Sequence, residues 1–475
     1  MNERHLLTVR RSALRVHRLL SLCILCVLCA SVVNPQPQRT APVTNRHVAP
    51  RLSTSNETFL EDLSRRSFLY FLEHADPQTG LVLDRARTDG AAHDANHPSF
   101  QIASSAATGF GLTALCTGAE RGWITRDAAR ERIRTTLRFF ATRATHERGW
   151  FLHWMDARTG ERRWRSEYSS IDTALLLAGV LTARSYFRED AEIARLATAI
   201  YNRVDFPWML AGHPSLLSHG WKPESGFLKA RWDTYSEHLI LQLLAIGSPT
   251  HPISPQAWRA WQRTRIGYLN YNYLDGDPLF VHQYSHAWVD FRGTRDSVAP
   301  YTDLFANSVR ATRAHREFCI FLGKRFPASY SADLWGITAS DSSRGYVAWG
   351  GPPPHTEIDG TIVPCAAGGS LMFTPDIAVL TLRTMREKFG DKIYGRYGFA
   401  DAFNPTTGWT GADVIGINVG ITLLSAENLR TENVWKWFMR NEEIPRAMYA
   451  TGIKRPNKPM RTQPSRTRTA QVKPT

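Results

Sequence analysis

Cysteine is scarce in this 475-residue chain, which contains only six. Three of them lie in an apolar segment near the N-terminus, and the other three are Cys116, Cys319 and Cys365. Three cysteines so widely spaced do not have the spacing of a metal site, and they can form at most one disulfide. The fold therefore does not depend on a disulfide framework.

Acidic residues are nearly absent from both ends of the chain. Residues 1–56 contain eight Arg and one Glu, and residues 453–475 contain seven Lys or Arg and no acid. These ends carry most of the net charge of +15 and leave about +1 for the intervening domain, residues 57–452. A nearly neutral body argues against nucleic acid as a partner. The tail is predicted to be a disordered basic extension, solvated or weakly associated with an anionic envelope.

Charged residues are also missing from Leu19 to Val33, an apolar run that follows five arginines. This layout is typical of a secretory signal, and the run is short for a membrane span. The Pro-rich polar stretch that follows, residues 34–56, is interpreted as a linker. We therefore expect an exported protein, periplasmic or secreted, in which residues 1–33 are a signal peptide or an uncleaved anchor.

The sequence lacks a repeat of fixed period, which counts against an α-solenoid. Two kinds of helical segment alternate instead. Residues 129–140 and 193–204 place their apolar side chains in one stripe, the pattern of a helix with one wet face. Ile171–Leu181 and Leu239–Ile246 are apolar nearly all round, as a helix surrounded by protein must be. This alternation predicts an all-α fold built as a double ring of helices.

The helical pattern breaks between Ser331 and Pro364, where the chain has five Gly, four Pro and two Trp. A long aromatic loop inside a compact domain is often functional. We expect this segment to form a rim at one mouth of the fold, with Trp335 and Trp349 contacting a ligand.

Carboxylates stand beside aromatic residues where two of the inner helices are predicted to begin. Glu167 and Asp172 flank serines that can cap a helix, and a helix N-terminus favours an anion. Glu237 directly precedes the apolar run from Leu239, so loss of hydration should raise its pKa and let it donate a proton. Cleavage of a glycosidic bond needs such a pair of carboxyl groups. Taken one at a time, the acids have equally good structural roles as helix-stabilising residues.

A third cluster lies between Val281 and Arg292 and combines hydrogen-bonding groups with aromatic faces, as sugar binding requires. The predicted binding residues here and near Glu237 are Trp232, Tyr235, His282, Gln283, His286, Trp288, Asp290 and Arg292. His282 and His286 have an i, i+4 spacing that could bind a metal, but the accompanying HExxH pattern is absent. We therefore expect neither a metal nor another cofactor.

At these residues the sequence resembles the glycoamylase-like family, which contains bacterial endo-β-1,2-glucanases and domains of cyclic β-1,2-glucan synthases. The resemblance runs from about Phe68 to Met439. The matching strings are EYSSIDTALLLAG (167–179), YSEHLILQLLAIGSPTHP (235–252), VHQYSHAWVDFR (281–292), WGITASDSSRG (335–345) and AENLRTENVW (426–435).

The resemblance implies an (α/α)6 barrel with acids at one mouth. Our first hypothesis is a glycoside hydrolase that acts on a β-glucan, preferably β-1,2-linked, with inversion, and we expect a monomer. In that reading Glu237 is the proton donor, and Glu167 and Asp172 line the cleft.

One position departs from the family pattern. Where relatives tend to have Gly-Ile-Asp, this chain has Asn418, and an amide cannot accept a catalytic proton. If this position normally supplies the base, Asn418→Asp should raise hydrolysis, and the natural protein is a non-catalytic glycan-binding envelope protein, a transglycosylase or a phosphorylase. Otherwise another acid serves as base, and the sequence does not rank Asp359, Asp401 and Asp413.

Overall fold

The computed structural model describes residues 52–353 and 357–454. The predicted signal or anchor, most of the linker and nearly all of the basic tail lie outside these residues. The domain begins slightly earlier than predicted, because helix α1 starts at Thr54 with Ser53 as its cap. It also ends later, because Ile453 is buried and Lys454 pairs with Arg295. The tail was predicted to start at residue 453. Ile453 and Lys454 instead belong to the domain, because Lys454 pairs with Arg295 through the backbone.

Helices make up most of the regular structure in the described residues, as the sequence predicted. They are α1 (Thr54–Glu73), α2 (Ser105–Glu120), α3 (Arg126–Thr142), α4 (Ser170–Tyr186), α5 (Ala191–Asn202), α6 (Leu239–Gly247), α7 (Ala257–Ala260), α8 (Tyr284–Trp288), α9 (Leu304–Leu322), α10 (Pro364–Gly368), α11 (Pro375–Phe389), α12 (Gly416–Thr431), α13 (Asn433–Phe438) and α14 (Glu443–Thr451). Three 3-10 helices are η1 (Pro207–Leu210), η2 (Leu279–His282) and η3 (Gly390–Lys392). In this part of the chain no helix is both long and apolar enough to span a bilayer.

The strands are only two to four residues long. They are β1 (Arg85–Arg87), β2 (Ile102–Ser104), β3 (His146–Glu147), β4 (Trp150–Phe151), β5 (Trp154–Asp156), β6 (Tyr168–Ser169), β7 (Gly220–Lys222), β8 (Gly226–Phe227), β9 (Arg265–Tyr268), β10 (Tyr271–Leu274), β11 (Ala339–Ser340), β12 (Val347–Ala348), β13 (Tyr394–Gly395), β14 (Gly398–Phe399), β15 (Phe403–Asn404), β16 (Trp409–Thr410) and β17 (Asp413–Ile415).

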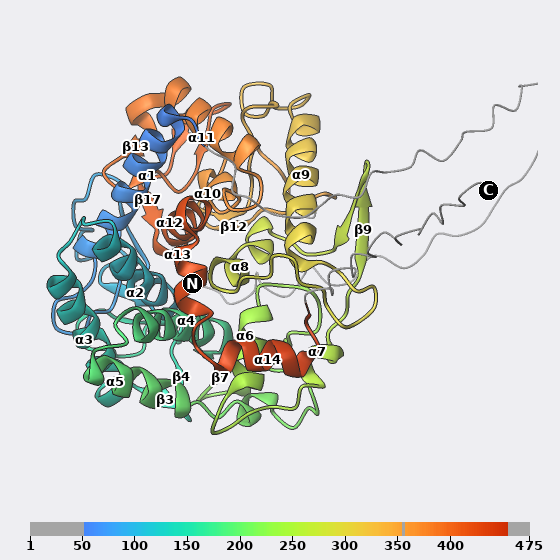
Figure 1. Ribbon diagram of the computed structural model, residues 1–475. Coiled ribbons are helices and arrows are strands. Elements are labelled where there is room, and N and C mark those ends of the chain that lie inside the picture. The colour runs from blue at the N-terminus through green and yellow to red at the C-terminus, as the bar shows by residue number, and fades with distance from the viewer. Residues whose placement is uncertain (1–51, 354–356, 455–475) are drawn as a thin grey trace, which may run out of the picture. The chain divides into compact units, whose positions relative to one another are not determined.

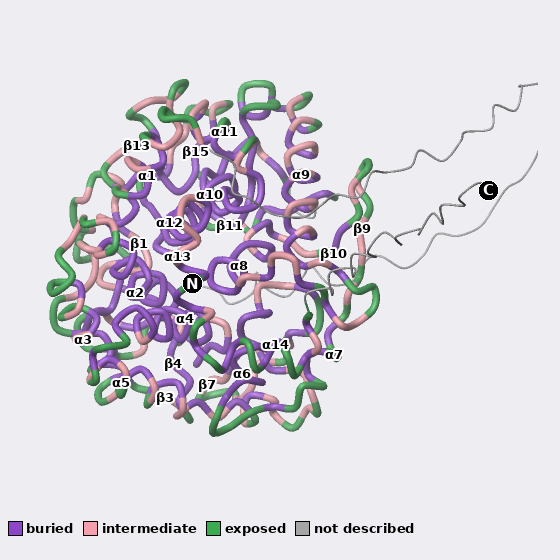
Figure 2. The backbone as a smooth tube through the Cα atoms, in the orientation of Figure 1, coloured by how far each residue is buried: buried purple, intermediate pink, exposed green. Residues whose placement is uncertain are grey.

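Inner and outer helices alternate along the chain. As predicted, α4 and α6 are buried nearly all round, whereas α3 and α5 bury one stripe. Helices α2 and α12 are also buried nearly all round. Figure 2 shows buried backbone toward the centre and exposed backbone around the edge, where Figure 1 places α3 and α5. Helices α2 and α4 cross closely because each has a glycine at the contact. A Cβ on Gly179 would lie 2.1 Å from the carbonyl oxygen of Gly109.

Short antiparallel strand pairs precede three inner helices. Strand β2 leads into α2 and pairs with β5, β6 leads into α4 and pairs with β7, and β17 leads into α12 and pairs with β1. Ser104 and Ser169 cap α2 and α4 with their side chains. These pairs bring loops from distant parts of the sequence to the N-terminal ends of the inner helices, and we call the resulting region the rim.

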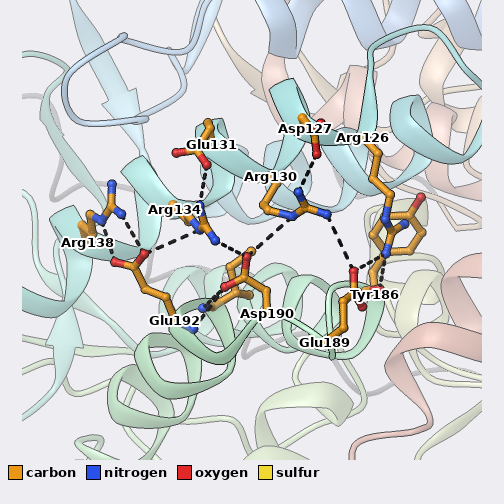
Figure 3. A network of polar contacts seen from close by, with 11 residues as sticks. Arg126, Asp127, Arg130, Glu131, Arg134, Arg138, Tyr186, Glu189, Asp190 and Glu192 are labelled. Atoms are coloured by element: carbon orange, nitrogen blue, oxygen red, sulfur yellow. Dashed lines mark hydrogen bonds and ion pairs between the residues drawn. The ribbon is translucent and has the colours of Figure 1, made fainter.

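A row of arginines joins outer helix α3 to the start of α5 (Figure 3). Their i, i+4 spacing puts all of them on one face of the helix, and they are Arg126, Arg130, Arg134 and Arg138. Asp190 accepts from Arg134 at 2.6 Å and also caps α5 by accepting from the backbone N–H of Glu192 and Ile193. Glu192 accepts from Arg138 at 2.7 Å. The cap and the ion pairs together fix α5 against α3.

Candidate active site

Glu167 and Asp172 lie on either side of a histidine at the rim. The Nδ1 of His153 is 2.9 Å from Glu167 Oε1, and its Nε2 is 3.5 Å from Asp172 Oδ1. Burial opposes the charged imidazolium, but the two carboxylates outweigh it and raise the pKa of His153. Burial opposes the charged form of Glu167, but the hydrogen bond and charge of His153, with a backbone hydrogen bond and the charge of Lys222, together outweigh it and lower the pKa of Glu167. Burial raises the pKa of Asp172, which also accepts from Ser169 Oγ at 2.5 Å.

These three groups offer ligand atoms that all lie within 4.8 Å of one another, close enough to hold a metal ion. In the sequence, only His282 and His286 had a spacing that suggested a metal. His153 was not among the candidates, because it lies outside the strings that match the family. An imidazolium between two carboxylates accounts for the arrangement by charge alone.

Glu237 precedes α6, as predicted, and its carboxyl group meets the hydroxyl of Ser236. Burial raises the pKa of Glu237, and the charge of nearby Asp172 raises it further. A raised pKa favours the protonated carboxyl group, which can donate its proton to a leaving oxygen.

Asn418 lies in the first turn of α12, and it contacts a second buried acid. Its Nδ2 donates to Asp401 Oδ1 at 2.8 Å, and the backbone N–H of Asp341 donates to Asp401 Oδ2 at 2.8 Å. Burial, together with the charge of Asp341, raises the pKa of Asp401 to about 7. The structure therefore separates the three acids that the sequence could not rank. Asp413 accepts from His93 at 2.9 Å, and Asp359 is 3.6 Å from Arg344.

A series of contacts runs from Trp154, the neighbour of His153, to Asp341, which bonds to Asp401. The indole N–H of Trp154 donates to Asp84 at 3.1 Å, and Arg85 lies 3.6 Å from Asp84 and 2.8 Å from Asp341. Tyr284 is near both Glu237 and Asp401. Its burial raises its pKa, and the charges of these two carboxyl groups contribute to the increase. The charge of Asp172 therefore acts on Glu237, and the charges of Glu237 and Asp401 both act on Tyr284.

Several predicted binding residues lie in the core instead of facing this site. Three of them bond to protein: Gln283 donates to Ala366 O at 2.9 Å, Trp288 donates to Thr113 at 3.0 Å, and His286 meets Ser308 at 3.2 Å. Gln283 Oε1 and His286 Nδ1 are buried without a hydrogen-bond partner among the described residues. His282 is buried as well, between the rings of Tyr235 and Tyr273. The prediction that His282, Gln283, His286 and Trp288 contact sugar is therefore wrong, because their side chains have no exposed face.

The other predicted aromatic residues are also covered. Trp232 stacks on His219 and donates to Ser170, the first residue of α4, at 2.9 Å. Its side chain is buried. Tyr235, Trp335 and Trp349 are buried too, and Trp349 donates to Ser340 at 3.2 Å. The side chains of these four residues are covered by protein, so the prediction that they contact a ligand directly is corrected.

Asp290 and Arg292 lie at a different end of the fold. Arg292 pairs with Asp290 at 2.8 Å and with Glu432, which follows the last turn of α12. Glu432 is fourteen residues beyond Asn418, or about 20 Å along a helix axis. Arg292 lines a separate cavity of about 710 Å³ there. The prediction that these two residues share the cleft with the acids is therefore wrong.

The chain matches the family model described as "Glycoamylase: Putative glucoamylase" over residues 229–442. It is 28% identical over 435 residues to the exo β-1,2-glucooligosaccharide sophorohydrolase (non-reducing end) of Parabacteroides distasonis. That alignment covers 83% of this chain but only 58% of the relative, so the chain corresponds to a little over half of that protein.

Two solved structures align with this chain over nearly their whole length. The endo-β-1,2-glucanase of Chitinophaga pinensis, in complex with sophorotriose and glucose, has a TM-score of 0.77 at 28% identity. The alignment covers 84% of this chain and 98% of the glucanase chain. A putative glucoamylase of Bacteroides fragilis has a TM-score of 0.76 at 30% identity and covers 86% and 99%. On this similarity, the chain belongs to the glycoamylase-like family.

Proposed function

We propose that this protein is a glycoside hydrolase that cleaves β-1,2-linked glucan by an inverting mechanism. The observation that carries the proposal is the pairing, at one rim, of two acids with raised pKa values, Glu237 and Asp401, in a chain similar to β-1,2-glucan hydrolases. The alternatives of a glycan-binding protein or a transglycosylase rested on a missing base. Asp401 removes that reason, because it is a carboxylate in direct contact with Asn418.

In this mechanism the protonated carboxyl group of Glu237 donates to the glycosidic oxygen as the bond to the anomeric carbon breaks. Asp401, with a pKa of about 7, is half ionised near neutral pH and accepts the proton of the attacking water. Asn418 acts as a positioning residue, because its amide N–H holds one oxygen of the Asp401 carboxylate. Glu167 and Asp172, which His153 holds together, line the cleft and accept hydrogen bonds from sugar hydroxyl groups.

We also propose that the helices form an (α/α)6 barrel with the acids at its N-terminal mouth. The packing order supports an inner set of helices, since α4 packs against α2 and α6, and α12 packs against α2, α8 and α10. Outer helices pack against this set, with α1 against α2 and α12, α3 against α2, and α5 against α4.

We further propose that the protein is an exported monomer. The support is in the sequence, where five arginines precede an uncharged apolar run from Leu19 to Val33. Mass spectrometry of the mature protein from a cell fraction outside the cytoplasm should show whether the segment is removed, and light scattering should give the mass of one chain.

The substrate is tested with purified protein and a panel of β-1,2-, β-1,3-, β-1,4- and α-1,4-glucans, with and without phosphate. We expect reducing sugar from the β-1,2-glucan alone, with the same yield in either buffer. Product only in phosphate would indicate a phosphorylase, and binding without product would indicate a glycan-binding protein.

A further inference from the structure

An exposed tryptophan stands next to the rim, on the turn between β5 and β6. The side chain of Trp164 is 47% exposed, and it is the one tryptophan among the large exposed apolar residues of the described chain. Its indole offers solvent a large, flat apolar face. Its backbone is also unusual, because Trp164 and Arg165 have consecutive left-handed φ angles of 52° and 49°. Side chains other than glycine seldom adopt that region, and such residues gather at functional sites.

The turn is held rigidly in this conformation. Arg162 donates to the backbone carbonyl of Arg165 at 2.8 Å and to that of Ser166 at 2.5 Å. The same guanidinium forms two bonds with Glu224, at 2.9 and 3.0 Å, which anchor the turn to the hairpin of β7 and β8. A fixed aromatic surface binds a ligand with little loss of conformational entropy.

A line of rings leads from Trp164 to the acids. The rings of Trp164 and Trp154 have their centroids 5.2 Å apart and are inclined by 69°. Trp154 stacks on His153 with centroids 3.4 Å apart, and the bond from its indole N–H to Asp84 fixes it in place. His153 contacts Glu167 and Asp172. Trp164 is therefore two rings away from the carboxylates, on the side that faces solvent.

We propose that Trp164, supported by Trp154, is an outer subsite that binds a glucosyl residue of the substrate chain away from the bond that is cleaved. The C–H groups on one face of a pyranose ring are apolar and match the face of an indole. A short substrate fills the positions beside Glu237 and does not extend to Trp164, whereas a longer one reaches both. Trp164 thus sets a preference for longer chains. This inference rests on the proposed glucan hydrolase function.

The test compares Trp164→Ala and Trp164→Phe with the wild-type protein on β-1,2-glucooligosaccharides of increasing length. The control variant is Tyr449→Ala, which removes an aromatic ring that is 81% exposed on α14. Helix α14 contacts the C-terminal end of α6 through Glu443, whereas Glu237 precedes the N-terminal end of α6. We expect Trp164→Ala to lower kcat/KM about tenfold on long substrates, through KM, as the loss of about 1.4 kcal/mol of binding would. The shortest cleaved substrate should be unaffected, Trp164→Phe should be intermediate, and Tyr449→Ala should match the wild type at every length.

Calorimetric titration of the Glu237→Gln variant, with and without Trp164→Ala, measures the same subsite without turnover. The affinity for a long oligosaccharide should fall about tenfold with the second substitution, and the affinity for a short one should not change. If the wild type cleaves β-1,2-glucan but Trp164→Ala keeps full kcat/KM on long chains, or loses equally at all lengths, the subsite is refuted and the hydrolase stands. If the wild type neither cleaves nor binds β-1,2-glucan, the proposed function and the subsite both fail.

Discussion

Asn418→Asp separates two accounts of how water is activated. If position 418 is the place of the base, the substitution restores it. The structure predicts the opposite, because Asn418 Nδ2 is only 2.8 Å from Asp401 Oδ1 and both residues are buried. An aspartate there would replace an N–H···O hydrogen bond with two carboxylate oxygens in contact.

The size of the effect follows from Coulomb's law. Two unit charges 2.8 Å apart repel by about 6 kcal/mol at an effective dielectric constant of about 20. That energy corresponds to a pKa increase of about 4 units. The pair would therefore hold a proton throughout the neutral range, starting from an Asp401 pKa that is already about 7. The one negative charge that remains is shared between two carboxyl groups that hold a proton, so the pair is a weaker base than Asp401 alone and kcat should fall, by up to about 10²-fold.

The assay is the pH dependence of kcat/KM on β-1,2-glucan. In the wild type we expect activity to rise with pH through about 7, as Asp401 loses its proton. In Asn418→Asp this rise should move out of the neutral range. Asn418→Ala is the control, because it removes the hydrogen-bond donor without adding charge. Since the bond from Asn418 lowers the pKa of Asp401, its profile should move toward higher pH, with a smaller kcat. A tenfold gain in kcat in Asn418→Asp, with an unshifted profile, would refute the role of Asp401 and assign the base to position 418.

Three further predictions concern other parts of the site and the fold. Glu237→Gln should lower kcat by about 10²–10⁴-fold with an unchanged melting temperature, because the amide fills the same volume and cannot donate the proton; near-wild-type turnover would remove Glu237 from the mechanism. His153→Gln should destabilise the protein more at pH 5.5 than at pH 9. The raised pKa of His153 means that its charged form stabilises the fold fully below the unfolded-state pKa, and this stability is lost as pH rises through the folded-state value; equal destabilisation in urea titrations at both pH values would contradict the ion pair. Asp190→Ala should lower the free energy of unfolding by about 1–2 kcal/mol through loss of the α5 cap, whereas Asp190→Asn keeps a capping oxygen and should lose less; equal losses in the two variants would show that the cap contributes little.

The helical part of the fold was predictable because each helix carries its own pattern. The apolar stripe in α5 predicts that one face of this helix is buried, and the apolar run in α6 predicts burial on all sides. The strand pairs at the rim were not predictable, since two or three residues are too few to show an alternation. Those pairs decide which distant loops meet, so the approach of Asp341 to Asp401 could not be foreseen.

The positions of the acids relative to the helices were predicted better than the surroundings of the aromatic residues. Glu237 and Asp172 precede or open inner helices, and helix starts leave a local signal in the sequence. His286 and Trp288 were misassigned because a hydrogen-bonding ring has the same composition in a core as in a cleft, and only burial distinguishes the two. His153 and Trp154 were missed because they lie in a short strand region with no helical start signal, and their role depends on contacts with Glu167 and Asp84.

The most direct test of the central claim is a proton NMR time course of β-1,2-glucan hydrolysis, which shows the anomeric form of the product before mutarotation. With Glu237 as acid and Asp401 as base, water attacks the face opposite the leaving group, and the first reducing ends should be the α-anomer. An initial β-anomer would show retention and require a covalent intermediate on a carboxylate, which contradicts the role assigned to Asp401. No product from β-1,2-glucan at any pH would contradict the account as a whole.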